Sequence, residues 1–185
     1  MPNSIPERSR LVFLVGFMGS GKTSVGHDLA TRLGCEFVDL DQRIEAISGR
    51  SVGAIFRDLG EGEFRRLEHE ALKELFRESG LMRVVALGGG AFAQPRNADA
   101  IRDVGAITIF LDAPPDVLWQ RCQEDPQERP LRGQYEQFAE LHGQRRKHYL
   151  QASWRVDSSH KSANDIAADL EQRINAELSA QEKTR

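Results

Sequence analysis

The chain has 185 residues, of which 39% are hydrophobic and 29% charged, and its formal net charge at pH 7 is -3. This composition is typical of one soluble globular domain, and the small net charge gives no reason to expect nucleic acid or an anionic membrane as a partner. No apolar run approaches the roughly 20 residues of a membrane span, and the N-terminus lacks the apolar stretch of a signal peptide. Two cysteines are too few for a disulfide framework, so we expect a cytoplasmic protein. We also expect it to be a monomer.

The N-terminal part of the chain begins with a strand and a helix. Residues 11–16 form an apolar run that predicts a buried strand, and Val25, Leu29 and Leu33 then recur at helical spacing. Residues 35–41 predict a second short strand. Buried strands joined through a helix are typical of a βαβ unit, in which the strands are parallel.

The rest of the chain repeats this alternation. The expected elements are, in order, a helix at 61–79, strands at 83–87 and 106–111, a helix opened by Pro114 and Pro115, a helix at 134–150, a strand at 154–157 and a helix at 163–178. We expect the polar segment at about 123–135 to be a connector or a mobile lid, and the tail at about 179–185 to be disordered. The pattern predicts a single α/β domain over residues 1–185, with a parallel sheet covered on both faces.

A phosphate-binding loop lies between the first expected strand and the helix that follows it. Gly16–Thr23 read GFMGSGKT and match the pattern G-x-x-x-x-G-K-[ST]. The glycines let the backbone wrap a phosphate, Lys22 can reach the β- and γ-phosphates, and the Thr23 hydroxyl can bind Mg²⁺. We therefore expect the chain to bind a nucleoside triphosphate.

Two classes of protein with such a loop remain open on these residues. One is a small-molecule kinase, and the other is a nucleotide-dependent switch or binding module. The guanine-reading pattern N-K-x-D of a GTPase switch does not occur in the sequence. Asp112, which follows the fourth expected strand, is an alternative metal-site residue.

The second expected strand ends in two aspartates, Asp39 and Asp41. At strand spacing alternate side chains point to the same face, and ligands of parallel α/β sheets collect at this edge. We expect one carboxylate to hold Mg²⁺ through water and the other to accept a hydrogen bond from a substrate hydroxyl. The competing interpretation is a helix N-cap with a solvated acid beside it.

Several arginines in the expected helices are candidates for ligand contacts. Arg65 has no acid four residues further along its helix, so its guanidinium group is a candidate to bind a ligand carboxylate, although spacing alone does not decide this. Arg66 and Glu70 have the spacing of an ordinary surface pair. The charged run 145–147 is typical of a solvated helix face.

Three consecutive glycines, Gly88–Gly90, follow the third expected strand. On their own they are consistent with a second phosphate loop or a tight turn. However, Gly16–Thr23 already serve the phosphates, and loops that follow parallel strands open on one edge of the sheet. We therefore expect the triplet to form the wall of a pocket for the acceptor substrate, facing Asp39 and Asp41.

Together the motifs GFMGSGKT, FVDLD, EFRRLE, LGGGA, ERPL and RRKHY resemble the shikimate kinase family in order and spacing, from about residue 11 to about residue 175. The resemblance implies a P-loop kinase fold of the nucleoside-monophosphate-kinase type, a three-layer α/β sandwich with a five-stranded parallel sheet and a lid. It implies ATP-dependent phosphorylation of the shikimate 3-hydroxyl, giving shikimate 3-phosphate and ADP on the route to chorismate and the aromatic amino acids. The nearest rival enzyme is a kinase of another hydroxy acid such as gluconate, whose family lacks the DLD and GGGA pairing.

The resemblance also implies roles for individual residues. It assigns contacts with ATP to Met18, Gly19, Ser20, Gly21, Lys22, Thr23, Arg121, Arg129 and Lys161. It assigns contacts with shikimate to Asp41, Arg65, Gly88, Gly89, Gly90 and Arg145. It assigns Mg²⁺ binding to Thr23 and Asp39, and it assigns catalytic roles to Lys22, Asp41 and Arg129. One departure is the sequence RPLR, which places Arg132 where the family has an apolar residue in the lid.

Overall fold

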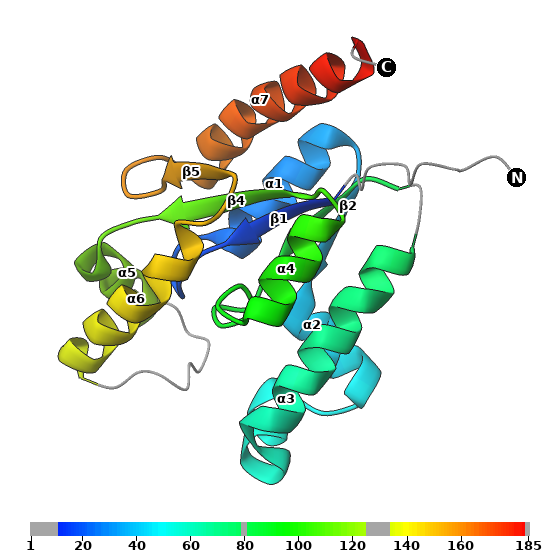
Figure 1. Cartoon of the computed structure of the whole chain (residues 1–185). Helices are drawn as coiled ribbons and strands as arrows, with labels where there is room; N and C mark the ends of the chain where they lie inside the picture. Colours follow the sequence, from blue (N-terminus) through cyan, green and yellow to red (C-terminus); the bar gives the residue numbers. More distant parts are fainter. Residues whose placement is uncertain (1–10, 79–80, 125–133, 184–185) are drawn as a thin grey trace, which may run out of the picture.

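The computed structural model describes residues 11–78, 81–124 and 134–183, and this part of the chain is built on a five-stranded sheet (Figure 1). The strand order is β2-β3-β1-β4-β5, and every neighbouring pair is parallel. The predicted parallel sheet is therefore confirmed. The strands are β1 (Leu11–Val15), β2 (Glu36–Asp39), β3 (Arg83–Ala86), β4 (Ile107–Asp112) and β5 (Trp154–Asp157).

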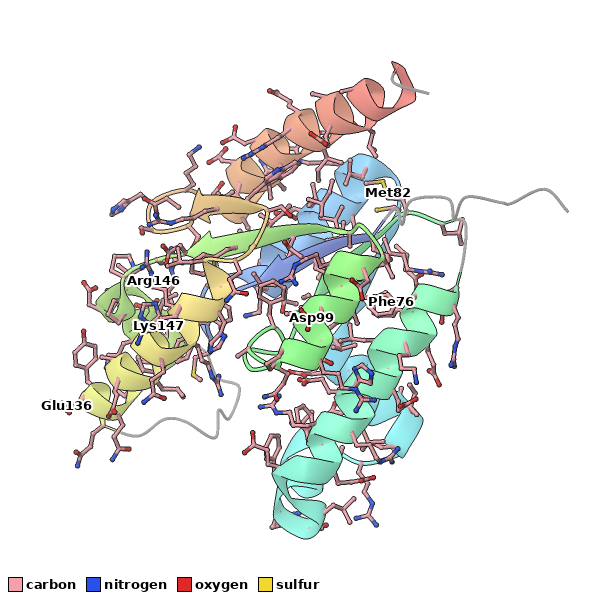
Figure 2. All side chains as sticks on the ribbon, viewed as in Figure 1. Phe76, Met82, Asp99, Glu136, Arg146 and Lys147 are labelled. Atoms are coloured by element: carbon pink, nitrogen blue, oxygen red, sulfur yellow. The ribbon has the colours of Figure 1, made fainter. Side chains whose placement is uncertain are left out.

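Helices cover both faces of the sheet, which makes the expected three-layer sandwich. One face carries α1 (Lys22–Leu33) and α7 (Ala163–Lys183). The other carries α2 (Leu40–Ser48), α3 (Val52–Arg77), α4 (Pro95–Asp103), α5 (Pro115–Glu124) and α6 (Tyr135–Tyr149). Exposed polar side chains such as Asp99, Glu136 and Lys147 mark the outer faces of α4 and α6 (Figure 2). In the described ranges, no helix combines the length and the apolar character needed to cross a membrane.

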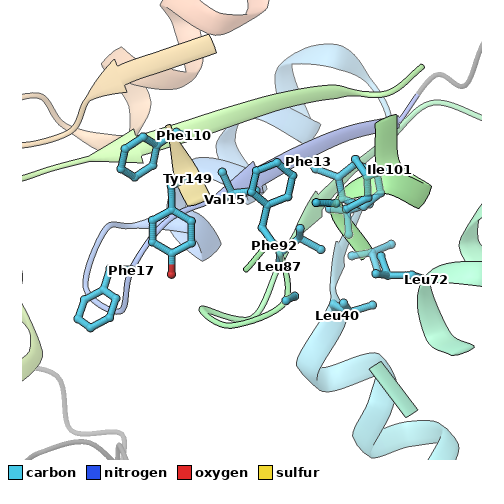
Figure 3. Packing of buried hydrophobic residues seen from close by; sticks show 14 of the residues in the cluster. Phe13, Val15, Phe17, Leu40, Leu72, Leu87, Phe92, Ile101, Phe110 and Tyr149 are labelled. Atoms are coloured by element: carbon cyan, nitrogen blue, oxygen red, sulfur yellow. The ribbon is translucent and has the colours of Figure 1, made fainter. Parts of the chain in front are cut away.

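Alternate residues of the central strand β1 enter two separate apolar clusters. Phe13 and Val15 belong to the cluster between the sheet and the helices α2 to α6 (Figure 3). Val12 and Leu14 belong to the cluster between the sheet and α1 and α7. Because both faces of β1 are covered, all five of its residues are buried, and its sequence is a continuous apolar run rather than an alternating one.

The second expected strand is shorter than predicted, because a helix begins inside it. β2 ends at Asp39, whose Oδ1 accepts hydrogen bonds from the backbone amides of Asp41 (3.0 Å) and Gln42 (3.2 Å). Asp39 is therefore the N-cap of α2, where an acceptor satisfies amides that have no partner within the helix. The prediction of a strand over 35–41 is wrong at its end, and Asp41 lies in the first turn of a helix.

The sequence pattern also misses α2, α4 and the first part of α3. α3 bends at Gly60, whose φ of 82° and ψ of 169° are not helical and lie in a region that favours glycine. The helix predicted over 61–79 corresponds to the part of α3 beyond this bend. α4 is short and mostly polar, and its buried face contains only Asn97, Ala98 and Ile101, so few apolar residues indicate a helix there.

The C-terminal helix α7 extends to Lys183, whereas the predicted helix ended at Leu178 and was followed by a disordered tail. Leu178 packs against the cluster of α1 and α7, and Ala180 and the residues after it have high helix propensity, so the helix continues. The expected lid at about 123–135 falls largely outside the described residues, since α5 ends at Glu124 and α6 begins at Tyr135.

Candidate active site

Three of the segments singled out in the sequence lie at one edge of the sheet. β2, β3 and β1 are neighbours, so the segments that follow their carboxyl ends are adjacent. These segments are the start of α2, the triplet Gly88–Gly90 and the phosphate-binding loop 16–23. Parallel α/β sheets bind their ligands at this edge, which makes it the candidate active site.

The phosphate-binding loop presents the N-terminus of α1 without a side-chain cap. Gly21 is the N-cap, its φ is 89°, and the first turn contains no acidic residue. Uncapped amides and the helix dipole together attract an anion. Lys22 Nζ donates to the backbone oxygens of Gly16 and Phe17, both at 3.0 Å, which holds the ammonium group against the loop. The loop therefore fits the phosphates of a nucleotide.

Asp41 reaches the glycine triplet from the first turn of α2. A Cβ atom on Gly88 would lie 2.6 Å from Oδ1 of Asp41, so the carboxylate lies against bare backbone. Oδ1 is buried, and no hydrogen-bond donor in the described part of the chain reaches it. Burial and the neighbouring carboxylate of Asp39 raise the pKa of Asp41, whereas the charges of Lys22 and Arg65 lower it. Such an oxygen can accept a hydrogen bond from a ligand hydroxyl.

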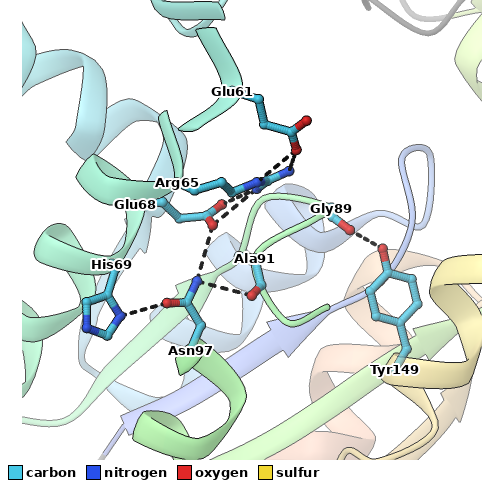
Figure 4. Close-up of polar contacts among 8 residues, drawn as sticks. All are labelled: Glu61, Arg65, Glu68, His69, Gly89, Ala91, Asn97 and Tyr149. Atoms are coloured by element: carbon cyan, nitrogen blue, oxygen red, sulfur yellow. Dashed lines mark hydrogen bonds and ion pairs between the residues drawn. The ribbon is translucent and has the colours of Figure 1, made fainter. Parts of the chain in front are cut away.

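Arg65 is paired with acids on its own helix, contrary to the prediction. Its Nε and Nη2 donate to Oε1 of Glu61 at 3.2 and 3.1 Å, and its Nη1 donates to both carboxylate oxygens of Glu68 at 2.9 and 3.1 Å (Figure 4). The prediction considered only the residue four positions after Arg65, whereas Glu61 lies four positions before it and Glu68 lies three positions after it. Glu61 is 65% exposed and Glu68 is fully buried, so a ligand carboxylate can displace the first while the second stays in place.

Arg65 and Arg145 both reach the glycine triplet, although they belong to α3 and α6. A Cβ atom on Gly90 would lie 2.5 Å from Nη2 of Arg65, and one on Gly89 would lie 3.2 Å from Nη1 of Arg145. The hydroxyl of Tyr149, also on α6, donates to the backbone oxygen of Gly89 (Figure 4). Arg145 is thus not simply part of a solvated helix face. The guanidinium groups of Arg65 and Arg145 both lie against the backbone of Gly89 and Gly90.

Glu68 is an acidic residue of the site that sequence reasoning misses. Burial raises its pKa to about 7, and the charge and hydrogen bonds of Arg65 and a hydrogen bond from Asn97 act in the opposite direction. The signal that identifies it is its position three residues after Arg65, on the same helix face. Its burial is the tertiary information that the sequence does not show.

Arg121 of α5 connects the phosphate-binding loop to the segment after β5. Its Nη2 donates to the backbone oxygens of Ser158 at 2.7 Å and Ser159 at 3.0 Å, and its Nη1 donates to that of Gly19 at 3.5 Å. The structure therefore places Arg121 beside the loop that fits the phosphates, where its side chain helps to hold the two segments together.

The other residues assigned to the nucleotide are less well placed by the structure. Lys161 forms an exposed ion pair with Asp169 of α7, with 2.5 Å between Nζ and Oδ2. Arg129 and Arg132 lie outside the described residues, so the predictions made for them stay predictions.

Asp112, the alternative metal-site residue, is bound by two arginines. Nε and Nη2 of Arg146 donate to its Oδ1 at 3.2 Å and its Oδ2 at 2.7 Å, and Nε of Arg155 donates to Oδ2 at 2.8 Å. A carboxylate held in this way is engaged in ion pairs, so the structure does not support Asp112 as a metal ligand. Across the described ranges, no group of three His, Cys, Asp or Glu side chains is arranged to hold a metal ion.

Comparisons with known proteins identify the family. The model of the shikimate kinase family matches residues 18–175. The chain belongs to the shikimate kinase family. The shikimate kinase of Geobacter sulfurreducens is 42% identical over 170 residues, which are 90% of this chain and 92% of the relative. A shikimate kinase from Acinetobacter baumannii, solved in complex with shikimate, is 34% identical with a TM-score of 0.81 and covers 90% of this chain and 93% of its own.

Family membership decides between the classes of protein that the sequence leaves open. Shikimate kinases are small-molecule kinases, so the chain is a transferase that uses ATP, and the switch or binding module is not favoured. A gluconokinase from Sinorhizobium meliloti is 17% identical with a TM-score of 0.55, which shows a shared fold alone. The predicted nucleoside-monophosphate-kinase-like fold is confirmed.

Proposed function

We propose that the chain phosphorylates the 3-hydroxyl of shikimate with ATP, giving shikimate 3-phosphate and ADP in the biosynthesis of chorismate and the aromatic amino acids. One observation carries the proposal. Each glycine of the triplet 88–90 lies against a different side chain, and these are Asp41, Arg145 and Arg65. Shikimate is a small ring with one carboxylate and several hydroxyls, so two guanidinium groups and a carboxylate oxygen without a donor complement it.

The substrate carboxylate would bind between Arg65 and Arg145. The Nε and Nη2 edge of Arg65 holds the exposed Glu61, and a ligand carboxylate can take its place with the same bidentate geometry. Glu68 would remain bound to Nη1 and keep the guanidinium group oriented. A carboxylate fixed in this way aims one hydroxyl of the ring towards the nucleotide, and such positioning lowers the barrier to transfer.

Asp41 would accept the hydrogen bond of the reacting hydroxyl at its buried Oδ1. Its raised pKa makes its carboxylate a better proton acceptor than an exposed aspartate, so it can take the hydroxyl proton as the phosphoryl group is transferred. The charge of Lys22 is close enough to lower this pKa, so the acceptor and the phosphates share one site.

The phosphate-binding loop and its surroundings would hold ATP and Mg²⁺. Lys22 would exchange its bonds to backbone oxygens for bonds to phosphate oxygens. The exposed hydroxyl of Thr23 fits Mg²⁺ directly, and Asp39 fits it through water, because only its Oδ1 is used by the helix cap. When bound, the metal neutralises charge on the phosphates. Arg121 and Lys161 are proposed for the nucleotide, and Arg129 for the transferring phosphate, from the family resemblance.

The proposal is tested by a coupled assay of ADP release with Mg²⁺-ATP and a panel of acceptors that includes shikimate, quinate and gluconate. We expect ADP release to depend on shikimate and to be lost in Asp41→Asn. ATP hydrolysis that is the same with and without shikimate would contradict the proposal and favour a switch. Stimulation by gluconate in place of shikimate would indicate a kinase of another hydroxy acid.

A further inference from the structure

A chain of buried hydrogen bonds connects Arg65 to the loop after β3 (Figure 4). At its centre is Asn97, which is 2% exposed and lies in the first turn of α4. Its Nδ2 is 3.2 Å from Oε2 of Glu68 and 3.2 Å from the backbone oxygen of Ala91, and its Oδ1 is 2.9 Å from Nδ1 of His69. Both protons of the amide and its oxygen are therefore engaged.

The direction of these bonds follows from the chemistry of the partners. The backbone oxygen of Ala91 and the carboxylate of Glu68 are acceptors, so Nδ2 of Asn97 donates to both. Oδ1 is therefore the acceptor, and His69 carries a proton on Nδ1. These three partners thus determine which way the amide of Asn97 faces. An aspartate has the same shape but two acceptor oxygens, so at this position it would place an acceptor oxygen against the acceptors Glu68 and Ala91.

We propose that Asn97 is a positioning residue for the substrate carboxylate, because it holds Glu68, and through it the guanidinium group of Arg65, in a fixed place relative to the glycine loop. The inference rests on the proposed function, which assigns Arg65 to shikimate. Arg65 and Glu68 share α3, so their ion pair alone orients neither of them relative to the loop. Asn97 supplies that link at Ala91, the residue that follows Gly90.

The energetics of Glu68 make this link effective. Its carboxylate is fully buried, and an ionised group in such a place needs each of its hydrogen bonds. The bond from Asn97 favours the ionised form and so acts against the rise in pKa that burial causes. Without that donor, the pKa of Glu68 rises further or its side chain changes rotamer, and either change alters its hold on Arg65. The phosphate-binding loop takes no part in this network, so ATP binding should not change.

The test is the variant N97D, which keeps the size of the side chain but places an acceptor oxygen against Glu68 and Ala91. Titration calorimetry with shikimate and no nucleotide should show the Kd at least tenfold higher, which corresponds to about 1.4 kcal/mol. In steady-state assays the KM for shikimate should rise similarly, while kcat at saturation and the KM for ATP change less than twofold. The matched control is N164D, the same chemical change at an exposed asparagine of α7, which should bind shikimate like the wild type.

A double variant distinguishes positioning from simple packing. In E68Q/N97D the new amide can donate to the new carboxylate, so the hydrogen bond returns with its direction reversed. We expect the double variant to bind shikimate more tightly than predicted by adding the losses of binding free energy of the two single variants. Additive losses, or N97D that binds like the wild type, would overturn the proposal.

A third variant keeps the proposal testable if N97D does not fold. H69F removes the donor to Oδ1 without adding a charge, and it should raise the Kd for shikimate about two- to fivefold, whereas an unchanged Kd would overturn the proposal. Wild-type protein that does not bind shikimate would refute the proposed function itself, which is a separate result from wild-type binding with unaltered variants.

Discussion

Glu68→Gln should change how the stability of the protein depends on pH. Burial raises the pKa of Glu68 from its ordinary 4.5 to about 7 in the folded state. Between these values the folded protein holds a proton that the unfolded chain releases, so the free energy of unfolding falls as the pH rises through this window. The pKa values of Glu68 in the folded and unfolded states differ by about 2.5, and at about 1.36 kcal/mol per pH unit this difference gives a loss of about 3 kcal/mol by pH 7. The side chain is fully buried, so solvent screening does not reduce this value.

The measurement is urea unfolding, followed by circular dichroism, at intervals from pH 4.5 to pH 8. Because Glu68→Gln cannot be protonated, its stability relative to the wild type should improve by about 3 kcal/mol as the pH rises from 4.5 to 8, and most of this change should occur below pH 7. Glu70→Gln, at a neighbouring position with a 43% exposed side chain, is the control and should follow the wild type in parallel. A constant difference between wild type and Glu68→Gln across the whole range would refute the argument that burial raises this pKa.

Four further predictions concern the two ligands. Arg65→Ala should raise the KM for shikimate about 10- to 100-fold, the effect of losing about 1.5–3 kcal/mol of charge-assisted hydrogen bonds, and equal effects on the KM for ATP would contradict the assignment. Glu61→Gln should lower the Kd for shikimate about twofold in calorimetry, because an exposed pair of this spacing contributes only about 0.3–0.5 kcal/mol, and a higher Kd would show that Glu61 helps binding. Gly90→Ala should raise the KM for shikimate more than Gly89→Ala, since the new Cβ would lie 2.5 Å rather than 3.2 Å from a guanidinium nitrogen, and a reversed order would count against the pocket wall. Lys22→Ala should abolish turnover with an unchanged thermal unfolding midpoint, and retained activity would remove the loop from the mechanism.

Much of the fold could be predicted from the sequence, because the elements that make it are regular. A strand covered on both faces has no exposed side, so β1 appears in the sequence as an unbroken apolar run, and β3 is apolar after its first residue, Arg83. The boundary between β2 and α2 could not be predicted in the same way. It depends on whether the Asp39 side chain accepts hydrogen bonds from the amides of Asp41 and Gln42. The sequence of residues 35–41 is equally compatible with an extended strand.

Only those residues of the candidate site that belong to local sequence motifs could be predicted from the sequence. The phosphate-binding loop is contiguous, so its pattern is sufficient. The partners of Arg65 at positions 61 and 68 follow from helical spacing once both directions along the helix are considered. By contrast, Asn97 is 29 residues from Glu68 in sequence, and no periodicity relates them. Their contact depends on how α4 packs beside α3, which is a property of the folded chain alone.

The glycine triplet shows most directly how the fold decides between interpretations that the sequence leaves open. A turn does span the triplet, because the amide of Ala91 donates to the backbone oxygen of Gly88 at 3.0 Å. A positive φ angle would explain the need for glycine in such a turn, as it does at Gly19 and Gly21. None of the three glycines has a positive φ in the described structure, so a left-handed backbone is not the reason for glycine here. What excludes a side chain is space, because a Cβ at each position would lie 2.5 to 3.2 Å from an arginine or aspartate. The glycines are therefore required by the side chains that approach them, and these are the side chains that complement a small hydroxy acid.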